Sequence, residues 1–160
     1  MALLLDQVTK MLAVRELAPG ISVDLVGDLL QLHLVRNPGA AFSAGESLTP
    51  LISVIAVVAT VTVAFYVAKV RHRGWAVALG LLLAGVSGNL IDRLFRSPGP
   101  FRGHVVDFFA LPNWPVFNIA DMCINLAAAC FVVLLLRGIH LDGTREQPGK
   151  DPGSSPEDAR

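Results

Sequence analysis

The sequence predicts an all-α membrane protein, a four-transmembrane-helix bundle with a small extracytoplasmic β-rich cradle loop. Hydrophobic residues make up 53% of the chain and charged residues only 16%, whereas a typical soluble domain has about 25% charged residues. Segments 51–68 and 74–91 each contain eighteen residues without Asp, Glu, Lys or Arg, and segment 117–136 contains twenty, interrupted only by Asp121. About twenty apolar residues are enough for a spanning helix. The formal net charge of zero gives no indication of nucleic-acid binding.

The first helix is predicted at about residues 1–17, where apolar residues recur at helical spacing. Asp6 and Lys10 lie four residues apart and therefore on one face of this helix. Only five residues precede Asp6, so a spanning helix would have little margin. We therefore expect the natural chain to begin further upstream.

Residues 19–50 contain no spanning segment. Leu30, Leu32 and Leu34 alternate with other residues over 30–35, a pattern typical of a half-buried strand. The sequence Asn37-Pro38-Gly39 indicates a turn. We interpret this region as a short sheet or cradle at the membrane surface.

The other three helices are predicted at about 51–70, 75–95 and 117–137. A basic cluster from Lys69 to Arg73 fills the very short connection between the first two. Because cytoplasmic loops are enriched in Lys and Arg, this connection is expected in the cytoplasm, on the same side as Arg137.

This orientation divides the rest of the chain between the two sides. Loops 19–50 and 97–116 are expected on the extracytoplasmic side, and residues 1–140 form a single membrane domain. Residues 141–160 are rich in Gly, Pro, Ser and charge without periodicity, so they are predicted to be a disordered cytoplasmic tail.

Polar residues gather at the outer ends of the third and fourth helices. In each helix they recur at spacings of three, four or seven residues, which places them on one face. Because the two polar stripes lie at the same membrane depth, we expect them to face each other. They comprise Asn89, Asp92, Arg93 and Arg96 on one helix and Asn118, Asp121 and Asn125 on the other.

Two aspartates suggest the chemistry. Asp107 precedes the last apolar segment and Asp121 lies just inside it, where a carboxylate is costly. Two carboxylates held close together do not both ionise easily, so one keeps a proton while the other acts as a base. Such a pair can activate water and protonate a leaving amine, the two acts that peptide hydrolysis requires.

Small residues in the third helix allow two interpretations. Gly80, Ala84 and Gly88 are spaced by four, which favours close helix packing. The segment Gly85-Val86-Ser87-Gly88 is similar to the serine motif of rhomboid-type intramembrane proteases, whose chemistry needs a histidine on a neighbouring span. We interpret Ser87 as a packing residue, because every histidine falls in a loop or at an end: His33, His72, His104 and His140.

The polar residues allow three further alternatives. A zinc protease is disfavoured because the chain has no HExxH motif. A carrier or ion-binding protein could use buried Asp, Asn and Arg, although such proteins usually have more spans or inverted repeats. Asp92 and Arg93 could simply be a salt-bridged pair at the end of a helix.

Cys123 and Cys130 lie seven residues apart on one helix, too far to form a disulfide.

Five segments resemble the sequence blocks of lipoprotein signal peptidase (signal peptidase II), and they occur in that family's order. The segments are Asp6-Gln7-Val8-Thr9-Lys10, Asn37-Pro38-Gly39-Ala40-Ala41-Phe42-Ser43, Gly88-Asn89-Leu90-Ile91-Asp92-Arg93, Val105-Val106-Asp107-Phe108 and Phe117-Asn118-Ile119-Ala120-Asp121. The resemblance implies an aspartyl endopeptidase of the bacterial inner membrane, active on the extracytoplasmic side. Its substrate would be a prolipoprotein, cut on the N-terminal side of a cysteine that carries diacylglycerol. Family members usually have a longer apolar run before the first block than the Met1–Leu5 segment found here.

The resemblance also implies roles for individual residues. The catalytic pair would be Asp107 and Asp121, with no metal or cofactor. The residues similar to those that hold substrate, or the antibiotic globomycin, are Asn37, Asn89, Arg93 and Asn118. The supporting polar residues would be Asp6, Lys10 and Asp92. Membrane lipid is expected beside the site, because the substrate is itself lipid-modified.

Overall fold

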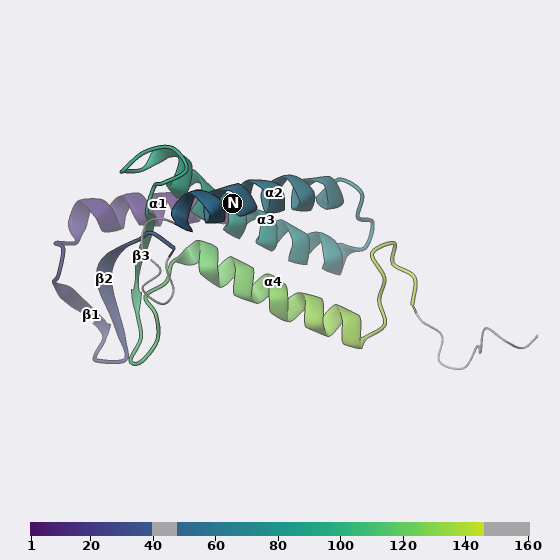
Figure 1. Ribbon diagram of the computed structural model, residues 1–160. Helices are drawn as coiled ribbons and strands as arrows, with labels where there is room; N and C mark the ends of the chain where they lie inside the picture. The colour runs from purple at the N-terminus through teal and green to yellow at the C-terminus, as the bar shows by residue number, and fades with distance from the viewer. Residues whose placement is uncertain (40–47, 146–160) are drawn as a thin grey trace, which may run out of the picture.

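The computed structural model describes residues 1–39 and 48–145 and is mostly helical (Figure 1). Three of its helices are long and apolar enough to cross a membrane, and α1, with fifteen residues, is not among them. The NPGAAFS segment beyond Gly39 and the predicted tail beyond Arg145 lie outside the described residues. The elements in chain order are α1 (Ala2–Glu16), β1 (Ser22–Val26), β2 (Leu30–Asn37), α2 (Thr49–Val67), α3 (Arg73–Phe95), β3 (Val105–Ala110) and α4 (Ile119–Leu136).

The helices pack around α3, which contacts both α2 and α4. α1 contacts α3, α4 and β3, so it joins the bundle to the sheet. Figure 1 shows the sheet at one end of the bundle, and the α2–α3 connection together with the end of α4 at the other. At that second end, the indole N–H of Trp75 donates to the carbonyl of Ile139 at 2.9 Å and its ring stacks on Phe131. The connection after α2 and the segment after α4 therefore meet on one side of the molecule.

The described strands form one antiparallel sheet in the order β1-β2-β3. The strand expected at 30–35 is confirmed and continues to Asn37. Within the predicted loop 97–116, residues 105–110 form β3 beside β2, a strand that the sequence did not indicate. Four successive residues of β3, from Val105 to Phe108, are buried. A strand buried on both faces shows no alternation of apolar and polar residues, so it carries no period-2 signal.

The last helix starts two residues later than the expected 117. The backbone of Phe117 forms reciprocal hydrogen bonds with Phe109, both at 2.9 Å, which keeps Phe117 extended beside β3. Asn118 is then the N-cap of α4. The chain passes directly from the sheet into the helix, and this fixes the helix start relative to β3.

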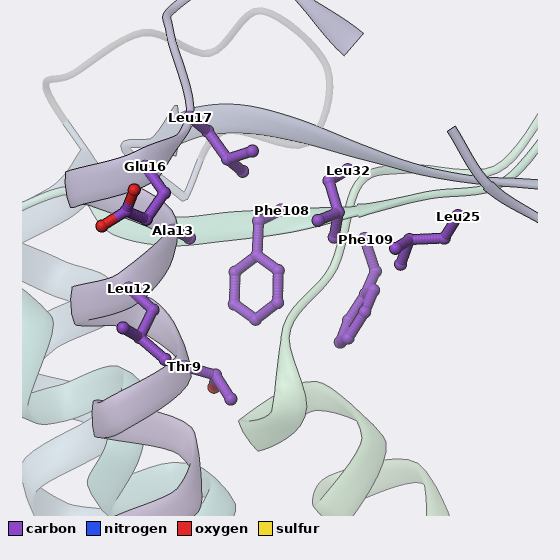
Figure 2. A pocket seen from close by; sticks show the side chains of 9 residues that line it. All are labelled: Thr9, Leu12, Ala13, Glu16, Leu17, Leu25, Leu32, Phe108 and Phe109. Carbon is purple, nitrogen blue, oxygen red and sulfur yellow. The ribbon is translucent and has the colours of Figure 1, made fainter. Parts of the chain in front are cut away.

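An apolar core joins α1 to the sheet. Ala13 of α1 packs against Leu34, Val106 and Phe108. Figure 2 shows the Phe108 ring beside α1, next to Phe109, at an apolar pocket between the helix and the strands. Because Phe108 follows Asp107 in the same strand, this core holds the strand that carries the aspartate.

Of the glycines predicted to allow close packing, Gly88 lies at a close contact and Gly80 does not, and Gly85 lies at one although spacing did not indicate it. A Cβ built on Gly80 meets no atom of the described residues within 4 Å. A Cβ on Gly85 would lie 2.6 Å from the Ala120 carbonyl oxygen, and one on Gly88 would lie 2.5 Å from Asp6 Oδ2. The two glycines that flank Ser87 therefore serve helix packing, which explains the resemblance to a serine motif.

Gly85 and Gly80 give a matched test of packing. Gly85→Ala should destabilise the protein by about 1–3 kcal/mol, because a backbone carbonyl cannot move aside cheaply. Gly80→Ala should leave stability unchanged or slightly raise it, since alanine is the better helix former. Thermal unfolding of both variants in detergent measures the difference, and equal midpoints would contradict the close approach at Gly85.

Candidate active site

Asp121 lies in the first turn of α4 and takes part in capping that helix. The Asn118 side chain accepts a hydrogen bond from the Asp121 backbone N–H at 3.0 Å, and Asp121 Oδ2 accepts one from the Asn118 backbone N–H at 3.2 Å. This reciprocal capping box satisfies two N–H groups that have no partner within the helix. The other oxygen, Oδ1, accepts a hydrogen bond from Asn89 Nδ2 at 2.8 Å. Both oxygens of Asp121 are thus held by the protein.

Asp107 lies in the middle of β3, and only 2% of its surface is exposed. Its Oδ2 accepts a hydrogen bond from Asn37 Nδ2 at 2.9 Å, and its Oδ1 accepts one from Asn118 Nδ2. The register pairs Asn37 with Val105, so Asn37 reaches Asp107 as a diagonal neighbour on the adjacent strand. The strand pairing therefore brings Asn37, 70 positions away in the chain, to the carboxylate.

Asn118 connects the two aspartates. Its side chain is fully buried, with the oxygen bonded to the Asp121 backbone and the nitrogen to Asp107 Oδ1. The same nitrogen lies 3.2 Å from Asn89 Oδ1 and 3.3 Å from the Val106 carbonyl oxygen. One asparagine thus contacts Asp107 through its side chain and Asp121 through reciprocal capping bonds. The two carboxylates are neighbours although they come from a strand and a helix.

The surroundings of Asp107 favour its protonated form. Burial raises the pKa of Asp107 from 3.8 to about 6, and the nearby charge of Asp121 acts in the same direction. Hydrogen bonds from Asn37 and Asn118 and the charge of Lys10 oppose this rise without cancelling it. A carboxyl with a pKa near 6 can hold a proton at a pH at which an ordinary aspartate cannot.

Arg93 holds the turn that follows β2. Arg93 is 8% exposed, and its guanidinium donates to the Pro38 carbonyl at 3.2 Å. Gly39 has φ +93°, and a Cβ there would lie 2.7 Å from Arg93 Nη2. The Gly39 N–H also donates to Asn37 Oδ1 at 2.8 Å, which leaves Asn37 Nδ2 turned toward Asp107. The Asn-Pro-Gly sequence is thus needed for both its backbone shape and the orientation of Asn37.

Behind the aspartates lies a buried cluster centred on Lys10, whose side chain is 0% exposed. Its ammonium donates to Asp6 Oδ2 at 3.0 Å, to Asp92 Oδ2 at 3.0 Å and to Asn89 Oδ1 at 2.9 Å. An ammonium has three N–H groups, so all three are engaged. These contacts fix α1 to α3.

The two carboxylates of this cluster extend it to the other elements. Asp6 Oδ1 accepts a hydrogen bond from the Ala120 N–H at the start of α4, at 2.9 Å. Asp92 Oδ2 accepts one from the Val106 N–H of β3 at 3.1 Å, and Asp92 Oδ1 pairs with Arg96 at 2.6 Å. The cluster therefore contacts every element that carries a residue of the site, except β2.

The structure brings the predicted site residues together. Eight of them form one network of side-chain hydrogen bonds and ion pairs, and Arg93 adjoins it through the turn at Pro38. The expectation that Asn125 belongs to this polar face is wrong, because its side chain is exposed. The eight residues are Asp6, Lys10, Asn37, Asn89, Asp92, Asp107, Asn118 and Asp121.

Sequence reasoning missed Thr49, whose hydroxyl donates to the Pro38 carbonyl at 2.7 Å and so supports the same turn as Arg93. Thr-Pro at a helix start is a recognisable local signal, but it does not reveal this distant partner.

The fold gives no support to the serine-protease alternative. His33 lies in β2, and His72, His104 and His140 lie outside the helices and strands, so none of the described helices carries a histidine. Within the described part of the chain, no three His, Cys, Asp or Glu side chains are grouped to hold a metal ion.

Comparison with known proteins places this arrangement in a family. The model of the signal peptidase (SPase) II family matches residues 1–137. A lipoprotein signal peptidase of Rhodococcus jostii is 49% identical over 141 residues, which cover 88% of this chain and 71% of the relative. One of Leifsonia xyli is 48% identical over 145 residues, which cover 90% of this chain and 67% of the relative.

The fold is also similar to that of a solved membrane enzyme. A bacterial membrane enzyme determined by the in meso method superimposes with a TM-score of 0.75 at 27% identity, covering 85% of this chain and 88% of that one. The family match spans the seven helices and strands of the described residues and every residue of the network. The chain therefore belongs to the signal peptidase II family and is an aspartic peptidase.

Proposed function

We propose that this membrane peptidase removes the signal peptide from prolipoproteins and cuts on the N-terminal side of a diacylglyceryl-modified cysteine. Family membership supports the substrate class. The observation that carries the proposed site is the contact of one buried side chain, Asn118, with both Asp107 and Asp121. That contact joins two carboxylates from different elements into one acid–base unit.

Peptide hydrolysis at this site uses the two carboxylates in different protonation states. The ionised carboxylate takes a proton from a water molecule as the water attacks the scissile carbonyl. The protonated carboxyl gives its proton to the leaving amine. The raised pKa of Asp107 supports a pair that shares one proton.

The polar residues around the pair differ in their access to a substrate. Asn37 is partly exposed and Arg93 retains 8% exposure, so these two side chains lie where they can touch a bound peptide. The amide of Asn89 is instead engaged at both ends, by Lys10 and Asn118 at its oxygen and by Asp121 at its nitrogen. Asn118 is fully buried and both ends of its amide are engaged. We therefore assign Asn118 to holding the aspartates, and Asn37 and Arg93 to holding the substrate backbone. Cyclic peptides of the globomycin type would compete for the same contacts.

The same proposal includes an arrangement in the membrane. α1 is the fourth membrane helix, since its outer face exposes apolar residues while Lys10 faces the bundle. The basic connection between α2 and α3 and the end of α4 lie on the cytoplasmic side of the inner membrane. The sheet and the site then lie on the extracytoplasmic side, within one membrane domain of residues 1–140. The apolar residues exposed on α1 are Leu4, Leu5, Val8, Met11 and Leu12.

Replacement of either aspartate tests the proposed pair. Asp107→Asn and Asp121→Asn should each lower cleavage of a diacylglyceryl-modified prolipoprotein at least about 100-fold, because one proton-transfer step is lost. Purified protein in detergent is assayed beside its thermal unfolding midpoint, to show that the variants remain folded. Asp24→Asn is the matched control, since Asp24 lies on the exposed strand β1 and contacts Gln31.

The outcomes of this assay are distinct. Cleavage at the wild-type rate by a folded Asp107→Asn or Asp121→Asn protein would remove that residue from the mechanism. Loss of activity in Asp24→Asn would show that the assay reports general damage. Retained binding of the substrate by both inactive variants is expected, since the substrate contacts at Asn37 and Arg93 are unchanged.

The raised pKa of Asp107 also predicts a pH dependence of stability. Because its folded-state pKa lies above 3.8, the folded protein binds more protons than the unfolded chain between about pH 4 and pH 6. This contribution to stability is fully present below pH 3.8 and is lost as the pH rises through about 6. Asp107→Asn removes the contribution. Between about pH 4 and pH 7.5 the wild type should therefore lose up to about 3 kcal/mol of stability relative to the variant. Unfolding midpoints of both proteins across this range measure it, and a constant difference would contradict the raised pKa.

A further inference from the structure

Lys10 contacts two carboxylates and one amide, and the amide contact leads to the active site. Its ammonium lies 2.9 Å from Asn89 Oδ1, and Asn89 Nδ2 lies 2.8 Å from Asp121 Oδ1. Lys10 is 0% exposed, so it does not touch a substrate. A charged residue of α1 is thus connected to Asp121 of α4 through a single side chain of α3.

The ammonium determines which way the Asn89 amide points. The two ends of an amide are similar in shape, but only the nitrogen donates and only the oxygen accepts. Because an ammonium can only donate, the Asn89 oxygen must face Lys10. The Asn118 amide nitrogen, 3.2 Å from the same oxygen, requires the same orientation. An inverted Asn89 would set its NH2 group against an ammonium and its oxygen against the Asp121 carboxylate, and both contacts would be repulsive.

From these contacts we propose that Lys10 is a positioning residue for Asp121, acting through Asn89. It keeps the Asn89 amide in the orientation that donates an N–H to Asp121 Oδ1. The other oxygen of Asp121 is already held by the cap at Asn118, so the two bonds together fix the carboxylate plane. The inference rests on the proposed function of Asp121 and adds a role for a residue that has no access to the substrate.

A simpler role for Lys10 is to tie α1 to α3 through its ion pair with Asp92. The two roles predict different behaviour. A structural tie affects stability whether or not Asn89 is present. A positioning role affects turnover, and the effect disappears when the Asn89 amide has already been removed. A double-mutant cycle separates them, because residues that act through one another are non-additive.

The cycle is built so that no carboxylate is left buried without a positive partner. Lys10→Met is therefore always made together with Asp6→Asn, whose oxygen can still accept from the Ala120 N–H, while Asp92 keeps Arg96. This paired change and Asn89→Leu are introduced singly and together. Trp75→Phe is the stability control, because it removes a hydrogen bond at the opposite end of α3. Each protein is assayed for kcat and KM with a diacylglyceryl-modified prolipoprotein, and for its unfolding midpoint.

Lys10→Met should lower kcat about 10- to 100-fold and leave KM within about twofold, because a misplaced catalytic group slows turnover without changing substrate contacts. In the protein that already carries Asn89→Leu, the same change should lower kcat less than about twofold further. Trp75→Phe should lower the midpoint without changing kcat. An equal loss of kcat with and without the Asn89 side chain would overturn the proposal.

A second variant decides the matter if Lys10→Met does not fold. Asn89→Leu in the wild-type chain keeps both ion pairs of Lys10 and removes only the link to Asp121. The proposal requires kcat to fall while KM stays within about twofold. A raised KM with unchanged kcat would make Asn89 a substrate contact and overturn it. Failure of the proposed function has a different signature, namely full cleavage by Asp107→Asn or Asp121→Asn.

Discussion

The buried ammonium of Lys10 is the interaction on which the rest of the structure depends. Through Asn89 and Asp92 it joins α1 to α3. Its two carboxylate partners, Asp6 and Asp92, accept N–H groups from the starts of α4 and β3. Such a cluster is stable only as a whole, because removing one partner of a buried ion pair costs about 3–5 kcal/mol. The positions of the site-bearing strand and helix are therefore set by charge as well as by apolar packing.

The charged groups of this cluster are connected through amides to the two aspartates, of which Asp121 is partly exposed and Asp107 is 2% exposed. Lys10, Asp6 and Asp92 lie at the back, the amides of Asn89 and Asn118 lie between, and the two aspartates lie in front. Each layer orients the next through hydrogen bonds of defined direction. This order suits hydrolysis near lipid, because a water molecule and a peptide need to reach only the outermost layer, while the costly charges behind it stay paired.

The sequence predicted the helical part of this arrangement better than the sheet. Runs without charge located α2, α3 and α4, and helical spacing correctly placed Asn89 opposite Asn118 and Asp121. Spacing could not identify which glycines meet α4, since Gly80 and Gly85 both lie on α3 and differ only in what packs beside them. β3 carries no alternating pattern, so the link from Asn37 to Asp107 depended on a pairing that no local signal reveals. Its place beside the last apolar segment and the resemblance to a family both indicated Asp107, but neither indicated which amides hold its carboxylate.

The capping box at Asn118 and Asp121 links the residue at which α4 begins to the orientation of the proposed catalytic carboxylate of Asp121. Asp121 occupies the N3 position, so α4 cannot begin one residue earlier or later without rotating the carboxylate by about 100°, the turn per residue of an α-helix. Insertions and deletions are consequently tolerable in the segment between Ala110 and Phe117, where only the sheet edge is affected, and intolerable within the four residues 118–121. Length variation during the divergence of such chains should stop sharply at Asn118, which makes this boundary a natural anchor for aligning distant sequences.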